Sequence, residues 1–84
     1  MITPAQSRAA RALLDWTQQD LANEAGVGLI TVHQLEAGTN QPRRATLEVI
    51  RRAFETAGVQ FIEEDGGGAG VRLKKAHRPR SGKK

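Results

Sequence analysis

The 84-residue chain contains no cysteine and no tyrosine. Without cysteine it can form neither a disulfide framework nor a thiolate metal site. No apolar stretch comes close to the roughly 18 consecutive residues of a membrane-spanning helix. The N-terminus also lacks the basic start and the apolar run of a secretory signal. We therefore expect no membrane segment and a cytoplasmic location.

Residues suited to catalysis or to holding a cofactor are equally scarce. The two histidines, His33 and His77, lie far apart in the chain and are expected to be exposed, so they do not suggest a metal site. The adjacent acids Glu63 to Asp65 precede a glycine-rich stretch and are interpreted as part of a solvated turn. A core this small also leaves little room for a substrate pocket. We expect no enzyme activity, no cofactor and no metal.

Positive charge is concentrated at one end of the chain. The formal net charge is +4. The residues before position 63 carry six basic and six acidic side chains, so the whole excess falls after them. Residues 76–84 show no apolar periodicity, and we expect a disordered basic tail there. Such tails often bind polyanions such as nucleic acids, although many only keep a protein soluble.

Apolar residues recur at helical spacing through the first two-thirds of the chain. Thr3 and Pro4 are typical of a helix start, as the N-cap and the first helical residue. Thr17 is placed to begin a second helix with a capping box. Trp16, between these two helices, is expected to pin one against the other. The pattern predicts four helices, over about residues 4–14, 17–25, 28–37 and 45–57.

The pattern changes after Gly58, which is placed to end the fourth helix. Two short β-branched and aromatic segments, Val59–Ile62 and Val71–Leu73, flank a glycine-rich stretch and predict a β-hairpin. An isolated hairpin is marginal in water, so this one should pack on the fourth helix or pair with another copy. We therefore divide the chain into a helical domain (1–58), a hairpin extension with a candidate role in dimerisation (59–75) and the tail (76–84).

The second and third predicted helices are joined by a tight turn. The small residue Ala22 falls where two such helices would cross, and Gly26 falls where a left-handed backbone excludes most other residues. Val27, Val32 and Leu35 complete an apolar wedge between the helices. This arrangement predicts a helix-turn-helix whose second helix has a free outer face that can enter a DNA major groove.

The same residues resemble a known family. The segments Trp16–Ala22, Gly26-Val27 and Val32–Gly38, with their Leu-Glu-x-Gly ending, are similar to the helix-turn-helix of the Cro/cI (XRE) repressors. The resemblance covers about residues 5–57. It implies a mainly α, four- to five-helix repressor-like domain, here followed by the short C-terminal β-hairpin and the disordered basic tail. The implied partner is double-stranded DNA.

The resemblance also implies an interface, residue by residue. Base contacts fall on the outer face of the third helix, at Leu29, Ile30, Thr31, His33 and Gln34. Phosphate contacts fall at Gln18, Gln19, Asn40, Arg43 and Arg44. The positions that maintain the motif are Arg11, Ala22, Gly26, Val32, Leu35 and Glu36. Of these, Arg11 and Glu36 match a pair that ties the first helix to the end of the third.

Two features depart from the family pattern. Gly28 occupies the N-cap of the recognition helix, where Ser or Thr is usual. Leu29 and Ile30 place aliphatic groups where polar side chains commonly lie. An aliphatic group can contact only a thymine methyl, whereas Gln34 can bind adenine with two hydrogen bonds. Base specificity would then be low, depend on Gln34 or come from DNA shape.

The sequence leaves three functions open. The first is a sequence-specific transcriptional regulator, in the usual case a repressor, that binds DNA as a homodimer. The second is the antitoxin of a toxin–antitoxin pair, which would bind a toxin through the hairpin or the tail. The third is a protein-interaction module that keeps the fold without binding DNA, with Leu29 and Ile30 as its contact patch.

Overall fold

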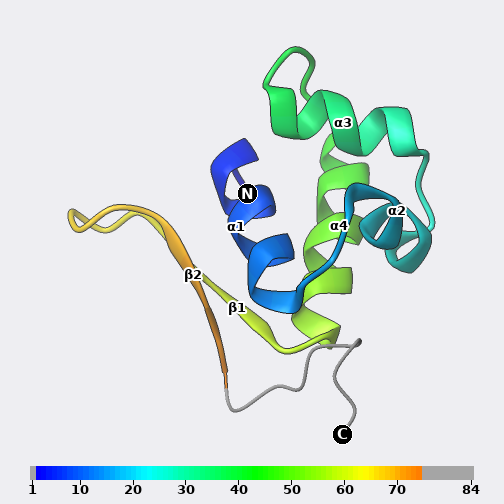
Figure 1. Cartoon of the computed structure of the whole chain (residues 1–84). Coiled ribbons are helices and arrows are strands. Elements are labelled where there is room, and N and C mark those ends of the chain that lie inside the picture. Colours follow the sequence, from blue (N-terminus) through cyan, green and yellow to red (C-terminus); the bar gives the residue numbers. More distant parts are fainter. Residues whose placement is uncertain (1, 75–84) are drawn as a thin grey trace, which may run out of the picture.

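The computed structural model describes residues 2–74, which form four helices followed by a two-stranded antiparallel sheet (Figure 1). The elements are α1 (Pro4–Leu14), α2 (Gln18–Ala25), α3 (Leu29–Ala37), α4 (Arg44–Thr56), β1 (Val59–Ile62) and β2 (Gly70–Leu73). The predicted fold class is confirmed over this range, whereas the tail predicted at 76–84 lies outside the described residues. None of the described helices is long and apolar enough to cross a membrane.

Local sequence signals set the helix boundaries. Thr3 starts α1 and Thr17 starts α2, each in a capping box that satisfies two main-chain N–H groups. Gly26 and Gly38 end α2 and α3 in the left-handed conformation, with φ angles of 70° and 73°. Because these signals are short-range, the predicted helix ends differ from the observed ones by no more than one residue.

The core lies between the helices and the inner face of the hairpin. Leu14, Leu21, Ile50 and Phe54 are fully buried and come from α1, α2 and α4. Trp16 is expected to pack between α1 and α2. Its indole also stacks on Phe54 of α4, with ring centroids 5.8 Å apart. The tryptophan therefore anchors the α1–α2 turn to α4, a contact that helical periodicity alone does not reveal.

The hairpin packs on both α1 and α4. Val59 and Phe61 alternate as the buried residues of β1, and Phe61 meets Phe54 edge-on with ring centroids 5.9 Å apart. Arg51 of α4 lies over the Phe61 ring and pairs with Glu63 at 3.0 Å. The expected packing on the fourth helix is thus present, and α1 adds a second support. The glycine-rich turn projects away from the helices (Figure 1).

A buried glutamine joins α1 to the hairpin. Gln6 is 5% exposed. Its Oε1 accepts the N–H of Thr3 in the capping box, and its Nε2 donates to the carbonyls of Ile62 at 3.3 Å and Gly70 at 3.0 Å. One side chain therefore satisfies main-chain groups of the helix cap and of both strands, so its loss would leave several buried groups without partners.

We predict that Gln6→Ala lowers the free energy of unfolding by about 1–3 kcal/mol, the usual cost of leaving buried polar groups unsatisfied. Urea unfolding measures the loss, and amide hydrogen exchange should show the hairpin opening before the helices do. Gln19→Ala is the matched control, because Gln19 is exposed on α2 and bonds only within that helix. Equal losses in the two variants would contradict the role assigned to Gln6.

Candidate nucleic-acid interface

The turn between α2 and α3 is fixed by two main-chain hydrogen bonds to one carbonyl. The N–H groups of Gly26 and Val27 both donate to the carbonyl of Ala22, at 2.9 and 3.0 Å. A methyl group added at Gly26 would meet nothing within 4 Å, so space does not require glycine there. The φ of 70° does, because it is a conformation that residues with a Cβ rarely adopt.

Small and apolar side chains bring α2 and α3 together. Ala22 is 2% exposed, and Val32 and Leu35 on the inner face of α3 are 0% and 3% exposed. Val27 packs against the same core from the turn. Because the inner face of α3 is fully used in this way, its outer face is left uncovered by the rest of the domain.

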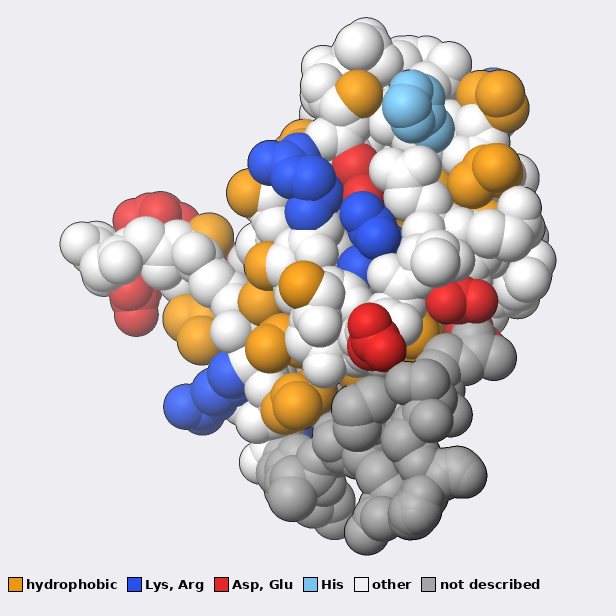
Figure 2. All heavy atoms as spheres, in the orientation of Figure 1, with side chains coloured by type: hydrophobic (Ala, Val, Ile, Leu, Met, Phe, Trp, Pro, Cys, Tyr) orange, Lys and Arg blue, Asp and Glu red, His pale blue; other side chains and the backbone are white. Residues whose placement is uncertain are grey.

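The predicted base-contacting residues all lie on α3. Leu29 and Ile30 are 43% and 68% exposed, and His33 is exposed as well. Thr31 and Gln34 are half-buried. Figure 2 shows the exposed apolar side chains and the histidine along α3, at the top of the view. The most accessible part of this helix is therefore apolar, with polar groups beside it.

The arginine side chains of the described residues differ in their partners. Arg8 and Arg72 donate hydrogen bonds without forming an ion pair. Arg11 and Arg51 form ion pairs with glutamates of the folded domain. Arg43 and Arg44 are the N-cap and first residue of α4, and both are exposed. Their side chains, like that of Arg52 further along α4, have no hydrogen-bond or ion-pair partner within residues 2–74. The charges of Arg43 and Arg44 are therefore available to an external anion.

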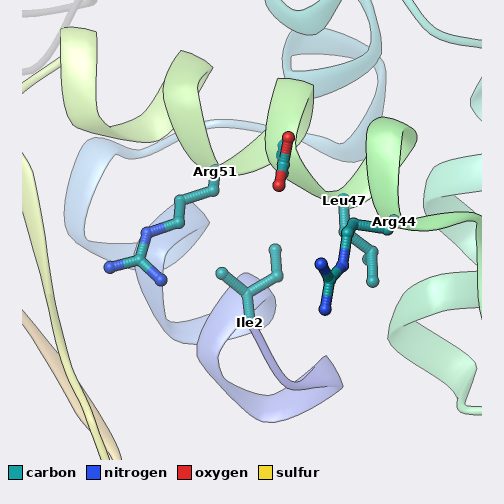
Figure 3. Close-up of a pocket in the computed structure, with 5 residues that line it drawn as sticks. Ile2, Arg44, Leu47 and Arg51 are labelled. Atoms are coloured by element: carbon teal, nitrogen blue, oxygen red, sulfur yellow. The ribbon is translucent and has the colours of Figure 1, made fainter.

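Arg44 also borders a cavity of about 280 Å³ beside α4. Figure 3 shows Arg44 and Arg51 extending from α4 on either side of Ile2, with Leu47 close by. Glu48 completes the lining. Arg51 is held by its ion pairs with Glu55 and Glu63. Of the two arginines that line the cavity, Arg44 is therefore the one whose side chain can turn towards a phosphate.

The other predicted phosphate contacts differ in how much their side chains are held. Gln18, the first residue of α2, is half-buried and donates its Nε2 to Oε1 of Glu36 at 3.1 Å. Gln19 donates to Asn23 at 3.0 Å along the same helix. Asn40 is exposed in the α3–α4 loop. The amide of Gln18 is therefore positioned by α3, a contact that the sequence did not predict.

A buried carboxylate stands at the junction of α1, α2 and α3. Glu36 is 4% exposed. It accepts hydrogen bonds from Ser7 Oγ at 2.6 Å, from Arg11 at 2.7 Å and from Gln18 at 3.1 Å. Arg8 donates to its main-chain carbonyl. The Arg11–Glu36 pair implied by the resemblance is thus present, and Ser7 and Arg8 are partners that the sequence analysis missed.

The sequence does carry a signal for Ser7. Ser7, Ala10 and Leu14 recur at helical spacing on the inner face of α1, and all three are buried. A hydroxyl on such a face needs a buried hydrogen-bond partner. The spacing cannot name that partner, however, because Glu36 is 29 residues away.

Burial alone would raise the pKa of Glu36, because it disfavours the charged form. The hydrogen bonds from Arg11, Ser7 and Gln18, together with the charge of Arg11, outweigh burial and hold the pKa below its usual value of 4.5. A carboxyl with a lower pKa in the folded than in the unfolded state adds stability above its unfolded pKa. That contribution is lost as the pH falls through the folded pKa.

We predict that Glu36→Gln destabilises the protein at neutral pH by about 2–3 kcal/mol, since Arg11 loses its charged partner. The variant should also lose less stability than the wild type as the pH falls from neutral to below 4.5. Urea unfolding at a series of pH values measures both effects. Glu24→Gln, which removes an exposed carboxylate of α2, should keep the wild-type profile. Parallel profiles for Glu36→Gln and the wild type would refute the assignment.

Comparison with known families agrees with this geometry. A helix-turn-helix family model matches residues 8–60, more than half of the chain. The match takes in the second half of α1, α2, the glycine turn, α3, all of α4 and the start of β1. A comparison with curated proteins found no match. The chain therefore belongs to the Cro/cI-type (XRE) helix-turn-helix family of DNA-binding regulators.

Proposed function

We propose that the protein is a sequence-specific transcriptional repressor that binds a pseudo-palindromic operator as a homodimer. The observation that carries this proposal is the outer face of α3, which the domain leaves uncovered and which carries all five predicted base-contacting residues. Two such helices would enter successive major grooves about 34 Å apart. The protein would act in the cytoplasm and without a cofactor.

Sequence reading would combine one polar and two apolar side chains. Gln34, half-buried on α3, can donate to and accept from an adenine edge. Leu29 and Ile30 are both exposed on α3 and match the methyl group of thymine, the apolar group of the major groove. Thr31 and His33 would complete the base contacts. This combination favours a half-site rich in A·T pairs.

Phosphate contacts would position this helix on the duplex. Arg43 and Arg44 are the best supported, because the folded domain does not neutralise either of them. Gln18, fixed by Glu36, and the exposed side chains of Gln19 and Asn40 would add polar contacts from α2 and from the α3–α4 loop. Phosphate contacts of this kind set orientation but do not carry sequence information.

We predict that Gln34→Ala weakens binding to the preferred duplex by about 1–3 kcal/mol per half-site, roughly 5- to 150-fold. The duplexes would be DNA from just upstream of the gene and pools enriched from a randomised library, titrated by fluorescence anisotropy at two salt concentrations. Thr56→Ala, at an exposed position at the end of α4, is the control and should bind like the wild type. Weak binding to every duplex that vanishes at the higher salt concentration would overturn sequence reading.

The exposure of Leu29 and Ile30 also favours a second candidate, a protein-interaction module that uses this apolar patch. The two candidate functions predict different effects of substitutions on α3. Replacing both residues with serine and replacing Gln34 with alanine should each weaken DNA binding by a repressor. An interaction module would lose its protein partner in the serine variant and be unaffected by Gln34→Ala.

The tail at 76–84 generates a separate prediction, from its charge alone. It contains Arg78, Arg80, Lys83 and Lys84 and no acidic residue. Deleting it should weaken binding to all duplexes about equally and reduce the salt dependence, by about 0.9 in log–log slope for each lost phosphate contact. Anisotropy titrations across a salt series measure both quantities. A truncated protein with a changed sequence preference would contradict a purely electrostatic role.

A further inference from the structure

A second apolar surface lies on α1 and the hairpin, away from α3. Ala5, Ala9 and Leu13 follow one another at four-residue spacing on the exposed side of α1, and Leu13 is 37% exposed. On β2, Val71 and Leu73 are only half-buried. Figure 2 shows apolar side chains gathered over α1 and the adjoining hairpin. We refer to these five residues as the α1–β2 face.

The α1–β2 face is grooved. A groove of about 400 Å³ runs between α1 and the hairpin, lined among others by Ala5, Ala9, Ala69 and Val71. Alanine side chains on one wall and the glycine-rich turn beside the other keep the groove open. A surface of this shape allows another helix or strand to approach the backbone of α1 closely.

We propose that the α1–β2 face is the surface through which two copies of this chain associate about a two-fold axis. The proposal rests on the proposed function, because a pseudo-palindromic operator requires a dimer, and it assigns the dimer to one particular surface. In a two-fold contact the same patch is buried on both copies, so the patch must be complementary to itself. The charges on the hairpin beside this patch, and the position of the patch relative to α3, both agree with this requirement.

Charge along the hairpin is self-complementary. The turn is acidic, and Glu64 and Asp65 accept only main-chain N–H groups of their own turn among the described residues. The other end of β2 is basic, with exposed Lys74 and exposed Arg72, whose Nε donates to Gln60 of β1 at 2.9 Å. A two-fold axis that crosses the hairpin brings the acidic turn of one copy to the basic end of the other. Complementary charges at the rim of an apolar contact favour this pairing.

The position of α3 agrees with the same axis. In Figure 1, α3 lies to one side of the hairpin and well away from it. Rotation about an axis that crosses the hairpin and points towards that side keeps both α3 helices on the same side of the dimer, as two successive grooves of DNA require. Self-association through Leu29 and Ile30 would instead cover the surface proposed to read DNA.

Sedimentation velocity over a range of protein concentrations, without DNA, tests the proposal. We expect the wild type to form a dimer and Leu13→Glu to raise the dimer dissociation constant at least about tenfold, because a charge would be buried in an apolar contact. Val49→Glu is the matched control: Val49 is also a helical residue, 44% exposed, but on α4. It should leave the dimer unchanged. Dissociation by Val49→Glu and not by Leu13→Glu would overturn the proposal.

A cross-linking experiment gives an answer that does not depend on the folding of Leu13→Glu. The chain has no cysteine, so a single introduced cysteine reports on one position. We expect a short bis-maleimide to link two copies of Ala9→Cys and to leave Val49→Cys uncoupled. The reverse pattern, or a wild type that stays monomeric, would overturn the proposed dimer surface. A dimer without sequence preference would refute the proposed function alone, and a sequence-reading monomer would refute this inference alone.

Discussion

One buried carboxylate determines how the DNA-facing part of this domain is assembled. Glu36, in the last turn of α3, contacts Ser7 and Arg11 of α1 and Gln18 of α2. A buried charge is costly unless several donors surround it, so these helices must take up positions that supply the donors. Together with the packing of Val32 and Leu35, these hydrogen bonds set the position of α3 and with it the direction of its outer face.

Contacts within the folded domain also determine which arginine side chains stay available for a phosphate group. The helical body has no net charge before residue 63, and its arginines are not equivalent. Arg11 stabilises Glu36, and Arg51 holds the hairpin through Glu63 and the Phe61 ring. The side chains of Arg43, Arg44 and Arg52 have no such partner within residues 2–74. A weakly charged body can thus still present a localised positive site where α4 begins, beside the end of α3.

Most of the fold could be predicted from the sequence because its signals are local. The capping boxes at Thr3 and Thr17 and the glycines that end α2 and α3 act within one turn of helix. The contacts that sequence reasoning missed are those between distant residues: Gln6 bonds across 56 and 64 residues to the hairpin, and Ser7 across 29 to Glu36. The DNA contacts themselves stay predictions, because they rest on the family resemblance and on which side chains the fold leaves exposed.

Apolar groups on the surface are informative here because the core does not need them. The inner residues Val32 and Leu35 already fix α3 against the domain, so Leu29 and Ile30 add little to folding and expose apolar area to water. Leu13, on α1, is likewise an exposed apolar residue. These exposed residues lie on different helices, Leu29 and Ile30 on α3 and Leu13 on α1. If α3 binds DNA and the α1–β2 face holds a second copy, as we propose, the two contacts use separate surfaces and neither covers the other.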